Sequence, residues 1–139
     1  MEHRGFEAAT AYGLKLLVPL LDNGVGHCLR KHGEFARVEL QLIIESCSGD
    51  LMDVGANFGA ICLPFAAANS DAIVVAIEAH PKIASALAEN AKINDLENVR
   101  VVHAAAGERT GKIDIPVRPL DIPANIGASS IYDRGLPIE

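Results

Sequence analysis

The sequence has no tryptophan and few other aromatic residues, namely four phenylalanines and two tyrosines. It therefore has little material for the aromatic platforms on which nucleic-acid binders stack bases. It also lacks a basic excess, because 12 lysines and arginines stand against 18 aspartates and glutamates, a net charge of -6. Proteins that bind nucleic acid usually carry a surplus of basic residues on one face. We therefore expect no nucleic-acid partner.

Long hydrophobic runs are missing as well. The strongest apolar run near the N-terminus, residues 16–21, contains a proline, whereas a membrane-spanning helix needs about 20 apolar residues. The three cysteines, Cys28, Cys47 and Cys62, are odd in number and widely spaced, so they form neither a disulfide framework nor a paired-cysteine metal site. We expect no membrane association, no bound metal and a reducing, cytoplasmic location.

The length of 139 residues, half of them apolar and 22% charged, fits one globular domain. Two segments are predicted within it. Residues 1–50 are expected to be an N-terminal helical segment, because apolar residues between positions 35 and 43 recur at helical spacing. Residues 51–139 are expected to form a second segment with alternating strands and helices.

Three strands are predicted in the middle of the chain, at 51–54, 72–77 and 99–103. The second is a continuous apolar run, as is typical of a parallel strand that is covered on both faces. Helices are expected between the strands, at 57–68 and 81–93, the latter with a proline in its first turn. The order βαβαβ predicts an α/β fold, one part of a doubly wound Rossmann-like sheet with its strands in the order 3-2-1.

A further strand is expected after the third one. Ile113, Ile115 and Val117 alternate as in a half-exposed strand that follows a turn bracketed by Gly107 and Gly111. This pattern predicts a short extra hairpin at the edge of the sheet. The rest of the C-terminal part is expected to be irregular.

The segment that points to a ligand is residues 53–59, DVGANFG, where a predicted strand runs through two glycines into a predicted helix. Gly55 permits a tight turn and a close approach of a ligand to the backbone, and Gly59 lets the start of the helix pack closely. The N-terminus of a helix offers unpaired N–H groups to an anion. Glu78 ends the next strand, where a carboxylate can accept both hydroxyl protons of a ribose. An adenosine-containing ligand across the strand ends is therefore predicted.

The glycine spacing favours one kind of ligand. Dinucleotide-binding loops have the pattern G-x-G-x-x-G, whose second glycine admits a pyrophosphate. Gly55 and Gly59 are instead separated by three residues, and the phosphate loop GxxxxGK[ST] is absent. S-adenosylmethionine has no phosphate and brings only a small carboxylate and a sulfonium. The spacing therefore favours S-adenosylmethionine over a dinucleotide.

Four segments resemble, in order and spacing, the FkbM-type methyltransferases: residues 53–59, 75–81 (VAIEAHP), 90–99 (NAKINDLENV) and 125–130 (NIGASS). The resemblance covers roughly residues 34–131. It implies a class I fold, S-adenosylmethionine as cofactor, and methyl transfer to a hydroxyl of a small molecule or sugar. It also implies a cofactor site in which the glycine-containing bend lines the methionine end, Glu78 holds the ribose and the backbone after the third strand faces the adenine. The residues so implied are Asp53, Gly55, Ala56, Asn57, Gly59, Glu78, Ala79 and Ala105.

The resemblance also predicts what is missing. In class I enzymes a fourth strand pairs with the first, and the ligand crevice lies where the strand order reverses. The chain has no such strand, so only one wall of the crevice is expected, and residues 51–54 are expected to be an exposed apolar edge. We therefore expect a truncated methyltransferase that forms a homo-oligomer or lacks its C-terminal half. Two alternatives remain, a non-catalytic interaction module that pairs through this edge and half of an NAD-type domain.

Overall fold

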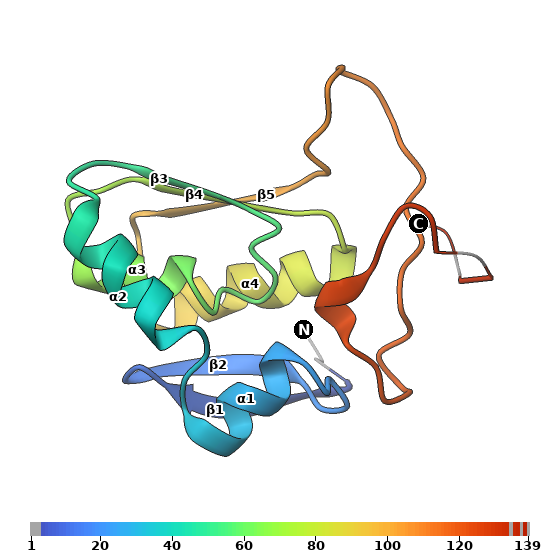
Figure 1. Cartoon of the computed structure of the whole chain (residues 1–139), viewed down its shortest axis with the longest axis horizontal. Helices are drawn as coiled ribbons and strands as arrows, with labels where there is room; N and C mark the ends of the chain where they lie inside the picture. Colours follow the sequence, from blue (N-terminus) through green and yellow to red (C-terminus); the bar gives the residue numbers. More distant parts are fainter. Residues whose placement is uncertain (1–3, 134, 137, 139) are drawn as a thin grey trace.

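The protein is represented by a computed structural model that describes residues 4–133, 135, 136 and 138. The extreme ends of the two predicted segments therefore lie outside the described residues. The chain is arranged in layers (Figure 1). A three-stranded parallel sheet lies on one side, helices α3 (Cys62–Ala68) and α4 (Pro81–Ile93) form the middle, and an N-terminal hairpin covers the helices from the other side.

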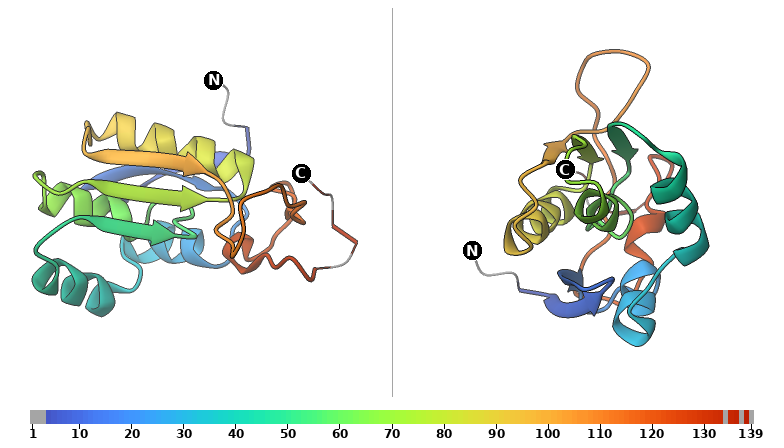
Figure 2. Two further views of the ribbon diagram at one scale, coloured as in Figure 1. Left: turned by 90° about the horizontal axis from the view of Figure 1, so that it is seen from above. Right: turned by 90° about the vertical axis from the view of Figure 1, so that its left-hand side faces the viewer.

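The central sheet consists of β3 (Leu51–Val54), β4 (Val74–Glu78) and β5 (Val99–His103) in the order β3-β4-β5. Both pairs of strands are parallel, which confirms the predicted 3-2-1 order. Seen from above, the three strands point toward the C-terminal segment of the chain (Figure 2). The carboxyl ends of the strands, where parallel sheets bind ligands, therefore face that segment.

The N-terminal segment corrects the expectation of an all-helical region. Strands β1 (Phe6–Ala11) and β2 (Leu14–Pro19) form an antiparallel hairpin, and within residues 4–50 only α1 (Val25–His32) and α2 (Arg37–Ser46) are helical. The two residues of the turn, Tyr12 and Gly13, both have positive φ, at 53° and 76°, as type I′ hairpin turns require. Leu16 is fully buried on β2, so the apolar run that contains it is a strand that packs on the core.

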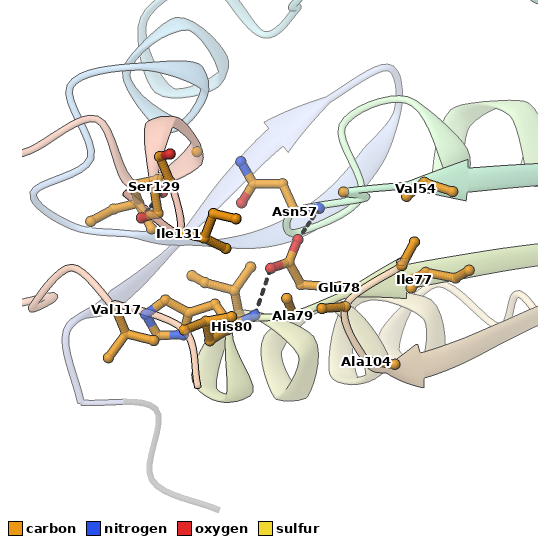
Figure 3. A pocket seen from close by; sticks show the side chains of 18 of the residues that line it. Val54, Asn57, Ile77, Glu78, Ala79, His80, Ala104, Val117, Ser129 and Ile131 are labelled. Carbon is orange, nitrogen blue, oxygen red and sulfur yellow. Dashed lines mark hydrogen bonds between the residues drawn. The ribbon is translucent and has the colours of Figure 1, made fainter. Parts of the chain in front are cut away.

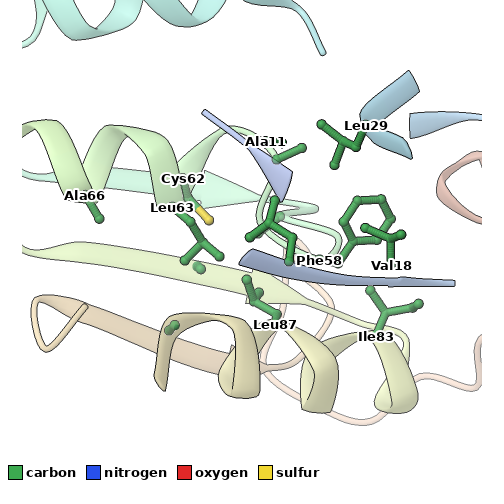
Figure 4. Close-up of a cluster of buried hydrophobic side chains, with 14 of the residues drawn as sticks. Ala11, Val18, Leu29, Phe58, Cys62, Leu63, Ala66, Ile83 and Leu87 are labelled. Atoms are coloured by element: carbon green, nitrogen blue, oxygen red, sulfur yellow. The ribbon is translucent and has the colours of Figure 1, made fainter. Parts of the chain in front are cut away.

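The hairpin is attached to α4 by two asparagines. Asn90 is fully buried; its Oδ1 accepts a hydrogen bond from the Leu17 N–H at 2.6 Å, and its Nδ2 donates to the carbonyls of Leu17 and Phe58 at 3.0 and 2.9 Å. Asn94 bridges to Lys15 in the same way. The edge of β2 thus gains the hydrogen-bond partners that a third strand would supply, and one apolar core joins the hairpin to the helices (Figure 4).

Helix α3 begins five residues later than predicted, at Cys62 instead of residue 57. Asn57 and Gly59 have φ of 52° and 98°, which a right-handed helix excludes. Gly59 also has no room for a side chain, because a Cβ there would lie 2.5 Å from Leu63 Cδ1 and 2.8 Å from Leu87 Cδ1. Residues 57–61 therefore form turns that bring the backbone close to the core.

The predicted hairpin around residues 113–117 is wrong. Among the described residues this region contains only an isolated bridge between Pro116 and Ile138. Pro116 has no N–H to donate, which removes a hydrogen bond of a regular ladder. The chain instead passes beyond the strand ends to a short 3₁₀ helix, η1 (Ile126–Ala128), beside the N-terminal loops (Figure 1).

The sheet has one covered face. Val74 and Ala76 of β4 are fully buried against the helices, whereas Met52 and Val54 of β3 and Val102 of β5 are 66%, 57% and 41% exposed. Among the described residues, β3 pairs only with β4, so its other edge is open. None of the described helices is long and apolar enough to cross a membrane.

Candidate functional site

The bend after β3 is shaped by backbone hydrogen bonds to β4. The N–H groups of Gly55 and Ala56 both donate to the carbonyl of Ile77 at 2.9 Å. Gly55 has φ of 80°, although a Cβ there would meet nothing within 4 Å. Glycine is thus needed for the backbone conformation, and the space that its missing side chain leaves is open to a ligand.

Glu78 points at this bend from the end of β4 (Figure 3). Its Oε2 accepts a hydrogen bond from the Asn57 N–H, and its Oε1 accepts one from the His80 N–H, both at 2.8 Å. Two carboxylate oxygens can accept about four hydrogen bonds, so these two contacts fix the carboxylate and leave acceptor capacity for a ligand. A vicinal diol is one group that would use it.

A cavity of about 310 Å³, which we call the strand-end cavity, lies beside Glu78 at the carboxyl ends of the strands. Its volume is at the lower end of the range usual for small-molecule sites, about 300–1,000 Å³. Five of the eight predicted site residues line it, namely Gly55, Asn57, Glu78, Ala79 and Ala105.

The opposite wall of the strand-end cavity corrects the expectation of a one-sided crevice. It is formed by the C-terminal segment, which the sequence did not predict as part of the site. The residues of this wall are Ile115, Pro116, Val117, Ile126, Gly127, Ser129, Ser130 and Ile131. His80 and Ile83, at the start of α4, were missed as well. The one sequence signal for this wall is segment 125–130, one of the segments that resemble FkbM-type methyltransferases.

Asp22 attaches this wall to the N-terminal part of the chain. Its side chain is buried, and its Oδ1 accepts a hydrogen bond from the Ile126 N–H at 3.0 Å. The N–H groups of Gly24 and Gly26 donate to the same carboxylate at 3.3 and 2.5 Å. The backbones of Asp22 and Ala124 also form an isolated parallel β-bridge. The loop before α1 therefore holds the 3₁₀ helix in place.

The remaining predicted residues have other positions. Asp53 and Ala56 line a second cavity of about 290 Å³, the bend cavity, which shares Gly55, Asn57 and Gly127 with the strand-end cavity. The two cavities therefore meet at the bend. Gly59 lines neither of them and has a packing role instead.

Two titrating groups lie close together behind the bend. Burial raises the pKa of the Asp53 carboxyl above its ordinary value; hydrogen bonds from Cys62 lower this pKa and the charge of Glu78 raises it. Burial and the neighbouring Asp53 charge raise the pKa of the Cys62 thiol far above its usual range. Cys62 is fully buried in the core, and we expect its thiol to stay protonated and unreactive. In the described part of the chain, no three histidine, cysteine, aspartate or glutamate side chains lie close enough to hold a metal ion.

This geometry is that of a partial Rossmann-like fold, and three solved methyltransferase structures are similar to it. TYW2 from M. jannaschii, solved in complex with AdoMet, matches with a TM-score of 0.58 and 22% identity over 72% of this chain. The tRNA m1G37 methyltransferase from M. jannaschii matches with a TM-score of 0.52 and 24% identity over 74% of the chain. Trm5 from Methanocaldococcus jannaschii, solved in complex with adenosine, matches with a TM-score of 0.52 and 23% identity over 74%.

The matching region is part of each of these longer proteins. The chain spans 43%, 30% and 31% of their respective lengths. No protein-family model matches the sequence, and no curated protein matches it either. The similarity therefore establishes the fold, and the resemblance to FkbM-type enzymes stays a prediction.

Proposed function

We propose that this chain is the cofactor-binding part of an S-adenosylmethionine-dependent methyltransferase. The observation that carries the proposal is the carboxylate of Glu78, which is fixed by the Asn57 and His80 N–H groups at the edge of the strand-end cavity. A carboxylate at the end of the second strand is suited to a ribose diol. Structural neighbours solved with AdoMet and with adenosine support the choice of ligand.

Five of the predicted residues then have a defined task. Glu78 would accept the hydroxyl protons of the ribose, and Ala79 and Ala105 would offer small apolar contacts to the adenine. The methionine end would lie at the bend, where Gly55 leaves open space and Asp53 supplies a carboxylate for the ammonium group. When bound, the cofactor supplies an electrophilic methyl group on a sulfonium. The chain's own contribution is to hold that group in line with an acceptor.

For the acceptor, we propose a hydroxyl of a small molecule or sugar. The net charge of -6 and the scarcity of aromatic residues support a small acceptor over a nucleic acid, as does the resemblance to FkbM-type enzymes. Two structural neighbours, in contrast, carry tRNA or Trm5 in their names. We do not infer the acceptor of this chain from the names of these two proteins.

The test is calorimetric titration with S-adenosylmethionine. Removal of a charge-assisted acceptor costs about 1.5–3 kcal/mol, so Glu78→Gln is expected to weaken binding about tenfold to a hundredfold. Glu97→Gln, an exposed carboxylate that lines neither the strand-end cavity nor the bend cavity, is the matched control and should bind like the unchanged chain. Circular dichroism checks that each variant is folded.

Two results would refute the proposal: no saturable heat with the folded chain, or unchanged affinity in Glu78→Gln. A parallel titration with NAD tests the dinucleotide alternative. Heat with NAD and none with S-adenosylmethionine would favour that alternative.

A second proposal is that the open edge of β3 pairs with another chain. Among the described residues β3 has no second partner, and Met52 and Val54 on the uncovered face beside this edge are more than half exposed. An unpaired apolar strand edge is a template for association. Sedimentation of the chain with and without Val54→Lys tests this proposal. A monomer at all concentrations in both forms would refute pairing with a second copy.

A further inference from the structure

The strand-end and bend cavities, which meet at the bend, carry negative charge without a balancing cationic side chain. Their described linings include two carboxylates, Glu78 and Asp53, and no lysine or arginine. Neither carboxylate takes part in the ion pairs of the described residues. Burial raises the pKa of Asp53, and the charge of Glu78 raises it further, as expected where two carboxylates face a site with no cation between them. A ligand that carries positive charge is therefore favoured there.

Phe35 is the only phenylalanine among the described lining residues of the two cavities, and none of these residues is a tyrosine or tryptophan. It lies in the loop between α1 and α2. The Tyr12 hydroxyl accepts a hydrogen bond from the Phe35 N–H at 2.7 Å and donates one to the Phe35 carbonyl. Both polar backbone groups of Phe35 are thus held by the hairpin turn, and its apolar side chain is the part available to line the bend cavity.

The polar parts of S-adenosylmethionine need different partners. In the proposed function, Glu78 accepts hydrogen bonds from the ribose hydroxyls and Asp53 binds the ammonium group. The sulfonium lies between these two parts of the molecule and has no N–H or O–H to donate, so a carboxylate cannot hold it by a hydrogen bond. The face of an aromatic ring attracts such a cation, as it attracts quaternary ammonium groups. Phe35 lines the same cavity as Asp53 and offers such a face.

We infer that Phe35 is a specificity-determining residue whose ring binds the sulfonium of S-adenosylmethionine, an inference that rests on the proposed function. S-adenosylhomocysteine, the product that remains after methyl transfer, has the same ribose and the same amino-acid end but a neutral thioether. Glu78 and Asp53 therefore contact groups that both molecules share. Phe35 contacts the group in which they differ, so its ring favours the methyl donor over the product.

The test is calorimetric titration of the chain with S-adenosylmethionine and, separately, with S-adenosylhomocysteine. Phe35→Leu keeps an apolar side chain but removes the aromatic face, and the ratio of the two affinities is expected to shift about threefold to tenfold against S-adenosylmethionine. Phe35→Tyr keeps the face and should keep the ratio. Phe6→Leu, at a half-buried phenylalanine that lines neither cavity, is the matched control and should leave the ratio unchanged.

A second measurement uses the unchanged chain and does not depend on the folding of a variant. The resonance of the S-methyl group of bound S-adenosylmethionine, labelled with carbon-13, is expected to move upfield, because a methyl group over an aromatic ring is shielded. Absence of an upfield shift would overturn the inference.

An equal loss of affinity for both ligands in Phe35→Leu would also overturn it, because a contact with the sulfonium distinguishes the two molecules. So would an unchanged ratio, or an equal change of the ratio in Phe6→Leu. If neither ligand binds the folded chain, the proposed function fails and this inference fails with it. If S-adenosylmethionine binds but the ratio does not depend on Phe35, this inference fails alone.

Discussion

Replacing Asp22 by alanine is expected to detach the C-terminal wall of the strand-end cavity and to lower the stability of the whole chain. The buried Asp22 carboxylate accepts two fully buried hydrogen bonds, from the Gly26 N–H at 2.5 Å and the Ile126 N–H at 3.0 Å. A buried donor that loses its acceptor costs about 1–3 kcal/mol, so two such donors cost about 2–6 kcal/mol. Water that enters the vacated space recovers part of this cost. We therefore expect a loss of about 2–4 kcal/mol, against a usual total of about 5–15 kcal/mol.

Urea unfolding followed by far-UV circular dichroism measures this loss, because the chain has no tryptophan to report by fluorescence. Asp71→Ala, an exposed aspartate in a turn, is the matched control and should change the free energy of unfolding by less than about 0.5 kcal/mol. Faster hydrogen exchange of the Ile126 amide would locate the effect at the wall. A loss in Asp22→Ala no larger than in Asp71→Ala would refute the reasoning.

Two further predictions concern the groups behind the bend. Because burial holds the Cys62 thiol protonated, a thiol-specific reagent should modify the two half-buried cysteines of the native chain and reach Cys62 only after unfolding; modification of all three at similar rates in the native chain would contradict this. The raised pKa of Asp53 means that the folded chain binds this proton more tightly than the unfolded chain. Its stabilising contribution is thus present below the ordinary value of 3.8 and is lost as pH rises through the higher folded value. The free energy of unfolding of the unchanged chain should therefore decrease over that pH range, and Asp53→Asn should remove this decrease. Urea unfolding at a series of pH values measures both chains. Parallel curves of free energy against pH for the two chains would count against the prediction.

The sheet and α4 could be predicted from the sequence because their signals are local. The continuous apolar run that became β4 indicates a parallel strand without reference to any other part of the chain, although the sheet is covered on one face instead of the expected two. Pro81 marks the first turn of α4, and the predicted span of 81–93 matches the structure. The approach of Glu78 to the bend also follows, because neighbouring parallel strands place their carboxyl ends side by side.

The attachment of the hairpin to α4 and the second wall of the strand-end cavity could not be predicted, because the residues that form them are distant in sequence. Strand β2 obtains its second set of hydrogen bonds from Asn90, 73 residues later in the chain. The wall depends on the contact between Asp22 and Ile126, which are 104 residues apart. Neither partner reveals the other by periodicity or spacing. The later start of α3 depends on the positive φ of Asn57, which a helical pattern does not indicate.

One face of the central sheet is not covered by the described helices (Figure 1). Parallel sheets are normally covered on both faces, and here Met52, Val54 and Val102 stay exposed. The walls of the strand-end cavity, however, come from the bend, the ends of β4 and β5 and the C-terminal segment, and they do not require a second layer of helices. Cofactor affinity is thus expected from this chain alone.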